Sequence, residues 1–212
     1  MCGRYSVMTE EDILEMREIL EEINRRFMGD PLLGSLRTGE IFPTHTVPVL
    51  EAGRDAPSRA TLMRWGFPRY QSPGVVINAR SETAAEKPMF RNAFAARRCV
   101  IPSTGFFEWR HEAGRKTGEK LLFRMPGKSM LYMAGLYGSF PAPAGTPAGT
   151  AGDGFTGFVI LTTPANASVA PIHDRMPLVL AEEELEAWMR ERPAALSLIS
   201  EPCRHLLTAV PA

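Results

Sequence analysis

The sequence has few cysteines and no long apolar run, and both absences narrow what the chain can be. Its three cysteines, Cys2, Cys99 and Cys203, lie far apart and form no disulfide framework. No segment is long and apolar enough to cross a bilayer, and the first residues lack the charged and apolar regions of a signal peptide. We therefore predict a cytoplasmic protein that binds no membrane and keeps its thiols reduced.

The short motifs of phosphate, dinucleotide and metal sites are also missing. There is no Walker-type glycine-rich loop, no dinucleotide fingerprint and no His-Glu-x-x-His. The histidines and cysteines never fall at zinc-ligand spacing, which excludes a zinc deaminase. We therefore expect no cofactor and no metal, so that any chemistry must come from side chains and the chain terminus.

Net charge is zero, but the charges are unevenly distributed. The 24 acidic and 24 basic residues argue against a protein that coats nucleic acid by bulk electrostatics. Residues 10–22 hold seven acids and one Arg, whereas residues 64–124 hold twelve Lys or Arg and five acids. This asymmetry permits a basic face, although the same charges would also serve simply to solvate a surface.

The order of apolar patterns predicts an α+β protein. A Thr-x-x-Asp capping pattern at Thr9 precedes apolar residues at helical spacing as far as Phe27, and Gly29 and Pro31 end this helix. Two further helical segments are expected around 81–96 and 182–190. Runs of β-branched and aromatic residues predict strands at 47–50, 61–67, 75–77, 99–101, 106–110, 121–125, 130–137, 155–162 and 206–210.

The length and hydrophobic content favour one domain. A chain of 212 residues with 44% hydrophobic residues can bury one substantial core, and we predict a single domain over 1–212. The Pro-, Ala- and Gly-rich stretch 141–154 lies between two strong strand patterns and lacks apolar periodicity. It is therefore expected to be a mobile hairpin loop within that domain.

Cys2 directly follows the initiator methionine and is the first candidate for chemistry. Removal of Met1 would leave Cys2 as the mature N-terminus, with an α-amine of pKa about 7.7–8.0 and a thiol near 8.5 on adjacent carbons. An aldehyde can condense with that amine to a Schiff base, after which the sulfur closes a five-membered thiazolidine ring. Cys2 could equally be a small hydrophobic residue at the start of a strand.

Several other segments, in matching order and at similar spacing from Cys2 to about Leu180, resemble the SOS-response-associated peptidase (SRAP) family. They are Met1-Cys2-Gly3-Arg4, Trp65-Gly66-Phe67, Asn78-Ala79-Arg80-Ser81-Glu82-Thr83, Cys99-Val100-Ile101-Pro102, Gly105-Phe106-Phe107-Glu108-Trp109, Leu161-Thr162-Thr163 and His173-Asp174-Arg175-Met176-Pro177. The chain departs from many relatives at Pro43-Thr44-His45, where they have Pro-Thr-Gln, and it reads Phe67-Pro68-Arg69 after Trp65-Gly66.

The resemblance implies both a fold and a function. The fold would be a single domain with a mixed, mostly antiparallel β-barrel-like core and flanking helices. The function would be to bind single-stranded DNA and to shield abasic sites by a covalent crosslink through Cys2 that protects the lesion during replication. We accordingly expect a monomer that associates with the nucleoid when bound to DNA.

The resemblance also implies catalytic partners for Cys2. Glu108 lies between two aromatic residues on a predicted strand, and a carboxyl partly shielded in a cleft could shuttle protons during Schiff-base formation. Histidine side chains can donate and accept protons near neutral pH, so His173 could serve the sugar ring oxygen. Asn78 would position the terminal amine, or it caps a helix start. Each of these residues also has an ordinary structural interpretation.

Further residues resemble the family's DNA contacts. The guanidinium forks of Arg4, Arg80 and Arg175 suit phosphate oxygens. Pro43 and Trp65 look like a wedge that stacks on bases beside the lesion, although Trp65 could also be a core residue. Thr162 resembles a further contact of the family, near the reaction centre. The remaining cysteines, Cys99 and Cys203, are assigned to the core and not to the site.

The sequence also permits two other functions. Cys2 could be the nucleophile of a cysteine peptidase, with its own amine as base and with autocatalytic removal of Met1. Alternatively the chain could be a module that binds single-stranded DNA without chemistry, in which case Arg4, Arg80 and Trp65 would matter and Cys2 would not.

Overall fold

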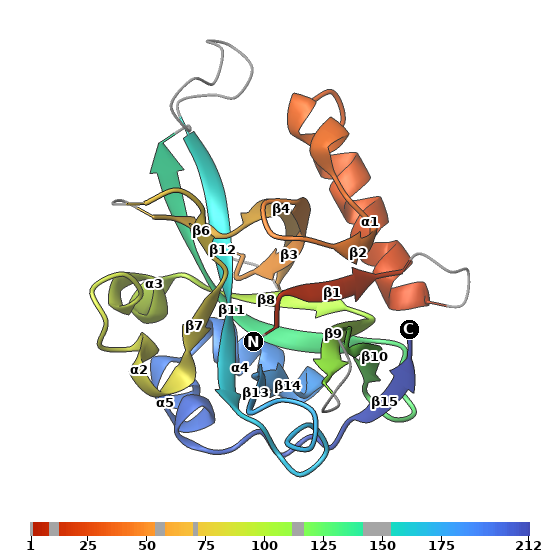
Figure 1. Cartoon of the computed structure of the whole chain (residues 1–212). Coiled ribbons are helices and arrows are strands. Elements are labelled where there is room, and N and C mark those ends of the chain that lie inside the picture. Colours follow the sequence, from red (N-terminus) through yellow and green to blue (C-terminus); the bar gives the residue numbers. More distant parts are fainter. Residues whose placement is uncertain (1, 9–12, 54–57, 70–71, 112–116, 142–153) are drawn as a thin grey trace.

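Five strands close into a ring at the centre of the fold (Figure 1). In the computed structural model, which describes residues 2–8, 13–53, 58–69, 72–111, 117–141 and 154–212, each strand pairs with the next and the last pairs with the first. All of these pairings are antiparallel except β12 with β4. In ring order the strands are β12 (Gly154–Pro164), β4 (Arg59–Trp65), β3 (Thr46–Glu51), β8 (Arg98–Ser103) and β11 (Leu131–Pro141).

Strand β12 gathers further short strands along its length. β7 (Asn78–Arg80) runs parallel to it, and β13 (Arg175–Pro177) pairs antiparallel with its last residues. β14 (Val179–Leu180) continues the sheet beside β11. The ring and these additions confirm the predicted α+β class with a mostly antiparallel, barrel-like core.

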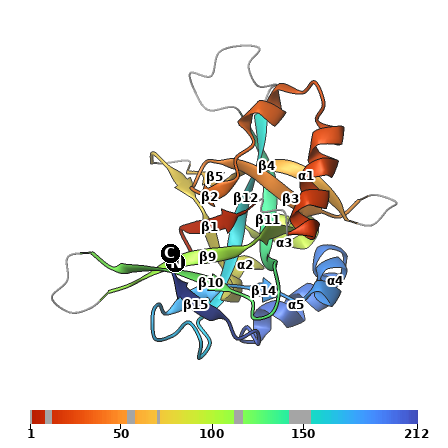
Figure 2. The ribbon, with the colours of Figure 1, turned by 90° about the vertical axis from the view of Figure 1, so that its right-hand side faces the viewer.

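A second, five-stranded sheet places the N-terminal strand beside the strand that carries Glu108. Its register pairs Arg4 with Phe107 and Tyr5 with Phe106. Tyr5 and Phe106 are fully buried in the core, so this face of the sheet packs inward. Figure 2 shows β9, β10 and β15 side by side. The order is β15 (Thr208–Pro211), β10 (Glu119–Arg124), β9 (Gly105–Arg110), β1 (Arg4–Val7) and β2 (Gly39–Ile41).

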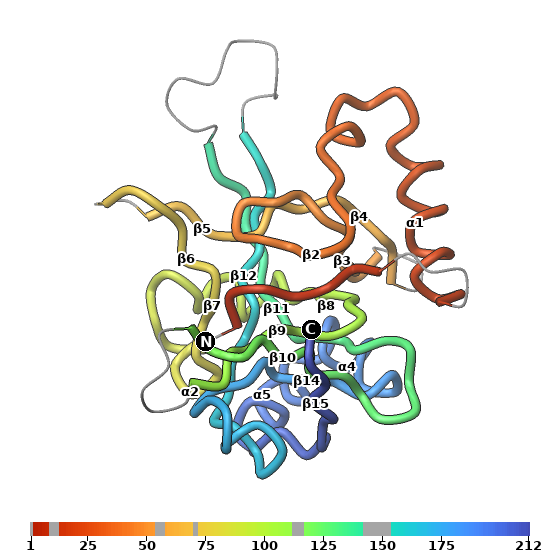
Figure 3. Tube along the Cα trace, turned by 45° about the vertical axis from the view of Figure 1, so that its right-hand side comes forward, coloured from red at the N-terminus to blue at the C-terminus, as the bar shows by residue number. Residues whose placement is uncertain are grey.

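Helix α1 (Leu14–Arg26) confirms the first helical prediction. Its buried side chains Met16 and Ile23 recur at helical spacing, and the helix packs against β3 and β4. The capping pattern at Thr9 lies outside the described residues. In Figure 3, α1 lies at the opposite end of the molecule from α2 (Ser81–Ala84) and α5 (Arg192–Ser200).

The prediction of one helix over 81–96 is wrong, because the segment forms α2 and α3 (Arg91–Ala96) with a turn between them. Pro88 lacks a backbone N–H and disfavours helical geometry at Lys87, which explains the interruption. The segment at 182–190 begins as a 3-10 turn, η2 (Glu182–Glu184), and continues as α4 (Leu185–Arg190). The remaining elements are η1 (Pro31–Ser35), β5 (Phe67–Pro68) and β6 (Val75–Val76).

A buried arginine joins two of these helices to the ring. Arg98, 3% exposed, lies on β8 and donates hydrogen bonds to the carbonyls of Trp188 and Met189 in α4 at 2.5 and 3.2 Å. It also reaches the carbonyls of Phe94 and Ala95 in α3 at 2.7 and 3.1 Å. These carbonyls lie near helix C-termini, where a cation is stabilising.

Among the described residues, no helix has the length and apolar character that a membrane span requires.

The predicted loop at 141–154 is described only at its two ends. Pro141 and Gly154 are register partners across β11 and β12. Residues 142–153 lie outside the described part of the chain, so the predicted mobility of this loop stays a prediction.

Candidate active site

Cys2 lies just before β1 and is completely buried. Its thiol donates to the carbonyl of Arg4 at 3.6 Å. Burial raises the pKa of this thiol well above its ordinary value, and the negative charge of Glu108 acts in the same direction. The thiol is therefore protonated near neutral pH in this state, and it must be activated before its sulfur can act as a nucleophile.

Glu108 lies on β9 and shares the inward face of that strand with the fully buried Phe106. Continuing the register beyond Arg4 and Phe107 brings Gly3 opposite Glu108. The side chain is 5% exposed, and its charge influences the thiol of Cys2. The structure thus brings the predicted acid close to the predicted nucleophile, which precedes the strand paired with β9.

Asn78 lies on β7 and contacts the backbone of Cys2. Its side-chain amide donates to the carbonyl of Cys2 at 2.9 Å. The other end of the amide, Oδ1, is buried and has no hydrogen-bond partner among the described residues. A buried acceptor without a partner costs stability, so this oxygen is suited to receive a donor from a ligand. Arg80 follows on the same face of β7 and is exposed.

Thr162 and Arg175 meet on β12 and β13, next to β7. Thr162 pairs with Arg80 in the parallel register and is fully buried. The guanidinium of Arg175 donates to the Thr162 carbonyl at 2.6 Å and forms a two-pronged ion pair with Glu82, which includes Nη2 to Oε2 at 2.8 Å. At 9% exposure, Arg175 is therefore not the free surface cation that a phosphate contact would suggest.

His173 lies in the segment that enters β13 and is half-buried. Its Nδ1 accepts a hydrogen bond from the backbone N–H of Arg175 at 2.9 Å. Nδ1 also lies 3.2 Å from the carbonyl oxygen of Arg175 and 3.0 Å from the carboxylate of Asp174, which is 86% exposed. Strands β13, β12 and β7 pair in that order, and β7 carries the Asn78 side chain that binds the carbonyl of Cys2. The segment of His173 is connected to Cys2 through these strands.

Arg4 lies on the outer face of the second sheet, in a group of charges and rings. It donates to Glu40 at 3.1 Å, and its guanidinium lies 4.5 and 5.1 Å from the ring centres of Phe42 and Trp109. Glu40 also receives Lys120 at 2.7 Å. Burial raises the pKa of Glu40, but the hydrogen bonds from Lys120 and Arg4 outweigh it and keep this pKa below its ordinary value.

The structure corrects the prediction for Trp65. This side chain is fully buried, stacks parallel to Phe158 with ring centres 6.4 Å apart, and donates to the carbonyl of Ile77 at 3.0 Å. A ring so enclosed does not stack on a nucleotide, and the alternative of a core tryptophan holds. Pro43, the other half of the expected wedge, lies half-buried in the turn between β2 and β3.

Two residues at this site were not predicted from the sequence. Tyr5 is fully buried, its hydroxyl has no hydrogen-bond partner among the described residues, and burial followed by the charge of Cys2 raises its pKa. Glu82 forms the ion pair with Arg175. The only sequence signal for either residue is its place inside a resembling motif, which does not indicate what the side chain contacts.

A comparison with family models identifies the family of this chain. The model of the family described as SOS response associated peptidase (SRAP) matches residues 1–211. The chain belongs to this family.

Individual relatives of this SRAP chain span nearly its whole length. It is 34% identical over 193 residues to abasic site processing protein YedK of Escherichia coli (strain K12), a match that covers 90% of this chain and 80% of YedK. It is 31% identical over 203 residues to abasic site processing protein YoqW of Bacillus subtilis (strain 168), covering 91% and 81%. The fold resembles a crystal structure of a Bacteroides thetaiotaomicron protein, with TM-score 0.73, 22% identity and coverage of 99% and 91%.

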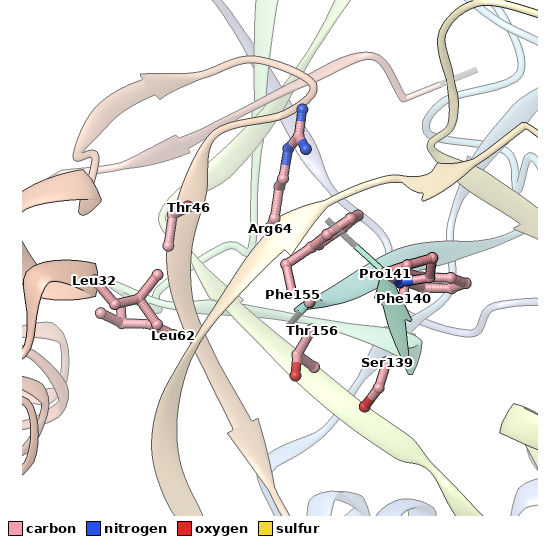
Figure 4. A pocket seen from close by; sticks show the side chains of 10 residues that line it. Leu32, Thr46, Leu62, Arg64, Ser139, Phe140, Pro141, Phe155 and Thr156 are labelled. Carbon is pink, nitrogen blue, oxygen red and sulfur yellow. The ribbon is translucent and has the colours of Figure 1, made fainter. Parts of the chain in front are cut away.

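A cavity of about 640 Å³ in this SRAP chain lies apart from the residues described above (Figure 4). Arg64 lies over the ring of Phe155 there, 5.1 Å from its centre. The cavity is lined by Leu32, Thr46, Leu62, Arg64, Ser139, Phe140, Pro141, Gly154, Phe155 and Thr156.

Within the described residues, no group of three His, Cys, Asp or Glu side chains is placed to hold a metal ion.

Proposed function

We propose that this protein captures abasic sites in single-stranded DNA by a covalent bond to Cys2, after Met1 has been removed. The observation that carries the proposal is the position of Cys2 between Glu108, whose charge acts on its thiol, and Asn78, whose amide binds its carbonyl. The names of YedK and YoqW as abasic site processing proteins support the choice of substrate.

The first bond would form between the freed amine of Cys2 and C1′ of the ring-opened sugar. The amine attacks the aldehyde to give a carbinolamine, which loses water to give an imine. Glu108 would accept a proton from the attacking amine and return it to the departing hydroxyl. Asn78 would hold the Cys2 carbonyl, and with it the amine, in one orientation.

Ring closure would then make the bond durable. The sulfur adds to the imine carbon, and the thiol proton ends on the nitrogen, so that a thiazolidine forms with no external reagent. Because the thiol pKa is raised, this step needs a base close to the sulfur, and the carboxylate of Glu108 suits that role. His173 would donate a proton to the sugar ring oxygen when the sugar opens.

A denaturing gel tests this proposal directly. Mature protein is mixed with a single-stranded oligonucleotide that carries one abasic site, and a slower band is expected. Cys2→Ala should abolish the band, whereas Cys203→Ala, which removes another buried thiol outside the site, should retain it. If wild type gives no band, or if Cys2→Ala retains it, the proposed covalent function is wrong.

A second variant separates the two bonds. Cys2→Ser keeps the amine and loses the sulfur, so borohydride should still trap an imine, while the unreduced adduct should not survive heating. An adduct from Cys2→Ser as durable as that of wild type would contradict the thiazolidine step.

Glu108 and Arg80 should separate chemistry from binding. Glu108→Gln from which Met1 has first been removed by an aminopeptidase should form the adduct about 10²-fold more slowly, within the usual range for a lost acid or base, with little change in DNA affinity. Arg80→Ala should instead weaken affinity and leave the rate at saturating DNA unchanged, because Arg80 is exposed and suited to a phosphate. Equal effects of both variants on both measurements would contradict these roles.

We also propose that the chain removes its own Met1. The position of Glu108 beside Cys2 and the description of the family as a peptidase support this step. Intact-mass measurement of purified wild type should show loss of Met1, while Glu108→Gln should retain it. Complete loss of Met1 from both proteins would assign the step to a cellular aminopeptidase.

A further inference from the structure

We propose that Glu82 is a positioning residue for the reaction at Cys2, acting through Arg175. It would hold the guanidinium in one orientation and thereby fix the segment of His173 against the strand of Asn78. The inference rests on the proposed function, because it assigns Glu82 a part in abasic-site capture.

The hydrogen bonds of Arg175 carry this inference. Nη1 and Nη2 bind the two carboxylate oxygens of Glu82, and Nη2 also donates to the carbonyl of Thr162 at 2.6 Å. Nε is buried and has no hydrogen-bond partner among the described residues. A two-pronged contact fixes the plane of a guanidinium, so Glu82 determines where this remaining donor points. An oxygen of the bound DNA strand is the acceptor that would complete the set.

The same ion pair connects two segments that are distant in sequence. Glu82 is the second residue of α2, which begins directly after β7 and therefore follows Asn78 by four positions. Arg175 opens β13, and its backbone N–H donates to Nδ1 of His173 at 2.9 Å. A bond between Glu82 and Arg175 thus restrains the loop that holds the imidazole relative to the strand that holds the amide. Such restraint matters because small displacements of reacting groups cost large factors in rate.

The charges of Glu82 and Arg175 distinguish a positioning role from simple attraction of a DNA phosphate by a cation. The hydrogen bond from Arg175 lowers the pKa of Glu82 to about 2, so the carboxylate is charged at neutral pH. The pair is then close to neutral, and Arg175 contributes a directed donor rather than a net positive charge. Removing the charge of Glu82 should therefore make DNA binding tighter, even though the geometry becomes worse.

Glu82→Gln tests this inference with two separate readouts. We expect the dissociation constant for a single-stranded oligonucleotide without an abasic site to fall severalfold, because one negative charge is lost. We expect the rate of adduct formation at saturating abasic DNA to fall at least tenfold, because the guanidinium loses its two-pronged partner. The urea midpoint of unfolding is measured alongside to confirm that the variant folds.

Three further variants complete the design. Glu86→Gln makes the same charge change at an exposed residue of the following turn and should leave the saturating rate unchanged. Glu82→Asp keeps the charge and should recover part of the rate, and it also serves if Glu82→Gln fails to fold. The double variant Glu82→Gln/Arg175→Met should react no more slowly than Arg175→Met alone, because both substitutions break one contact.

Each remaining outcome has a defined meaning. A saturating rate for Glu82→Gln within twofold of wild type would overturn the inference while leaving the proposed function intact. Rates and affinities that rise together would also overturn it, because Glu82 would then act only by repelling DNA. Absence of any adduct from wild type would instead contradict the proposed function itself, so the two failures are distinguishable.

Discussion

Two arginines, Arg98 and Arg175, are buried in the described part of the chain, and they differ in how fully their donors are used. Arg98 binds four backbone carbonyls of two helices. Arg175 binds Glu82 and one carbonyl, and it leaves Nε without a partner. A buried donor without a partner costs stability, so an evolved core tolerates it mainly where something else benefits. The saturated arginine maintains the fold, and the unsaturated one marks the site.

The same contrast separates the regions around them. Near Cys2, the buried polar atoms without a described partner include the hydroxyl of Tyr5 and Oδ1 of Asn78. Around Arg98, the neighbouring Trp188 places its ring nitrogen 2.9 Å from the carbonyl of Cys99. The region near Cys2 therefore gives up local stability to keep acceptors and donors available.

The largest stability effect is expected at Arg98. Arg98→Met would leave four carbonyls without their donor, and we expect the free energy of unfolding to fall by about 3 kcal/mol. Urea unfolding followed by circular dichroism measures the change. The neighbouring Arg97→Met, which alters an exposed side chain, is the control and should cost much less. Similar losses from both would erase the contrast between the two arginines.

A smaller stability loss is expected for Arg175→Met, together with a larger functional loss. Fewer of its hydrogen bonds involve buried acceptors, so we expect the free energy of unfolding to fall by about 1–2 kcal/mol. The rate of adduct formation at saturating DNA should fall at least tenfold. A loss of stability as large as that of Arg98→Met, with normal reactivity, would assign Arg175 to the fold instead.

Tyr5→Phe tests the region near Cys2 by a substitution that should raise stability, in contrast to those at Arg98 and Arg175. Its hydroxyl is buried without a described partner, so removing it should raise the free energy of unfolding by roughly 0.5 kcal/mol. The midpoint of thermal unfolding checks this sign. A clear fall in stability would mean that the hydroxyl has a partner whose contribution exceeds the cost of its burial.

The smallest effect is expected from acidification of the Glu82 pair. The pKa of Glu82 is about 2 in the folded protein against an ordinary 4.5, so its stabilisation is complete above about pH 4.5 and is lost as the pH falls towards 2. The side chain is 44% exposed, so solvent screens the pair and the contribution is small. Urea midpoints of wild type and Glu82→Gln should differ most at pH 7, differ by less at pH 3, and converge only below about pH 2, where the folded carboxyl becomes protonated. A difference as large at pH 3 as at pH 7 would contradict the ion pair as its source.

The sequence predicted what depends on local pattern and missed what depends on distant contact. Helix α1 and the strand of Glu108 follow from apolar spacing, so both were predictable. Short strands such as β7 and β13 have three residues each, too few to show any periodicity. Their existence depends on pairing with β12, which a single sequence does not display.

The candidate site divides in the same way. Cys2, Asn78, Glu108 and His173 were named from motifs, because each belongs to a short run of resembling residues. The partner of Arg175 was not predicted, since Glu82 lies 93 positions away in the sequence. The burial of Trp65 was also not decided, because a tryptophan suits a core and a base-stacking surface equally well. Only packing against Tyr5 and Phe158 distinguishes the two.

The pairing of Pro141 with Gly154 has a practical consequence for engineering. The ring of strands is already complete where these two residues face each other across β11 and β12. The entropy of closing a connection grows only slowly with its length. A reporter domain whose own termini lie close together could therefore be inserted between these two positions, giving a fusion that leaves the amino end of the chain untouched.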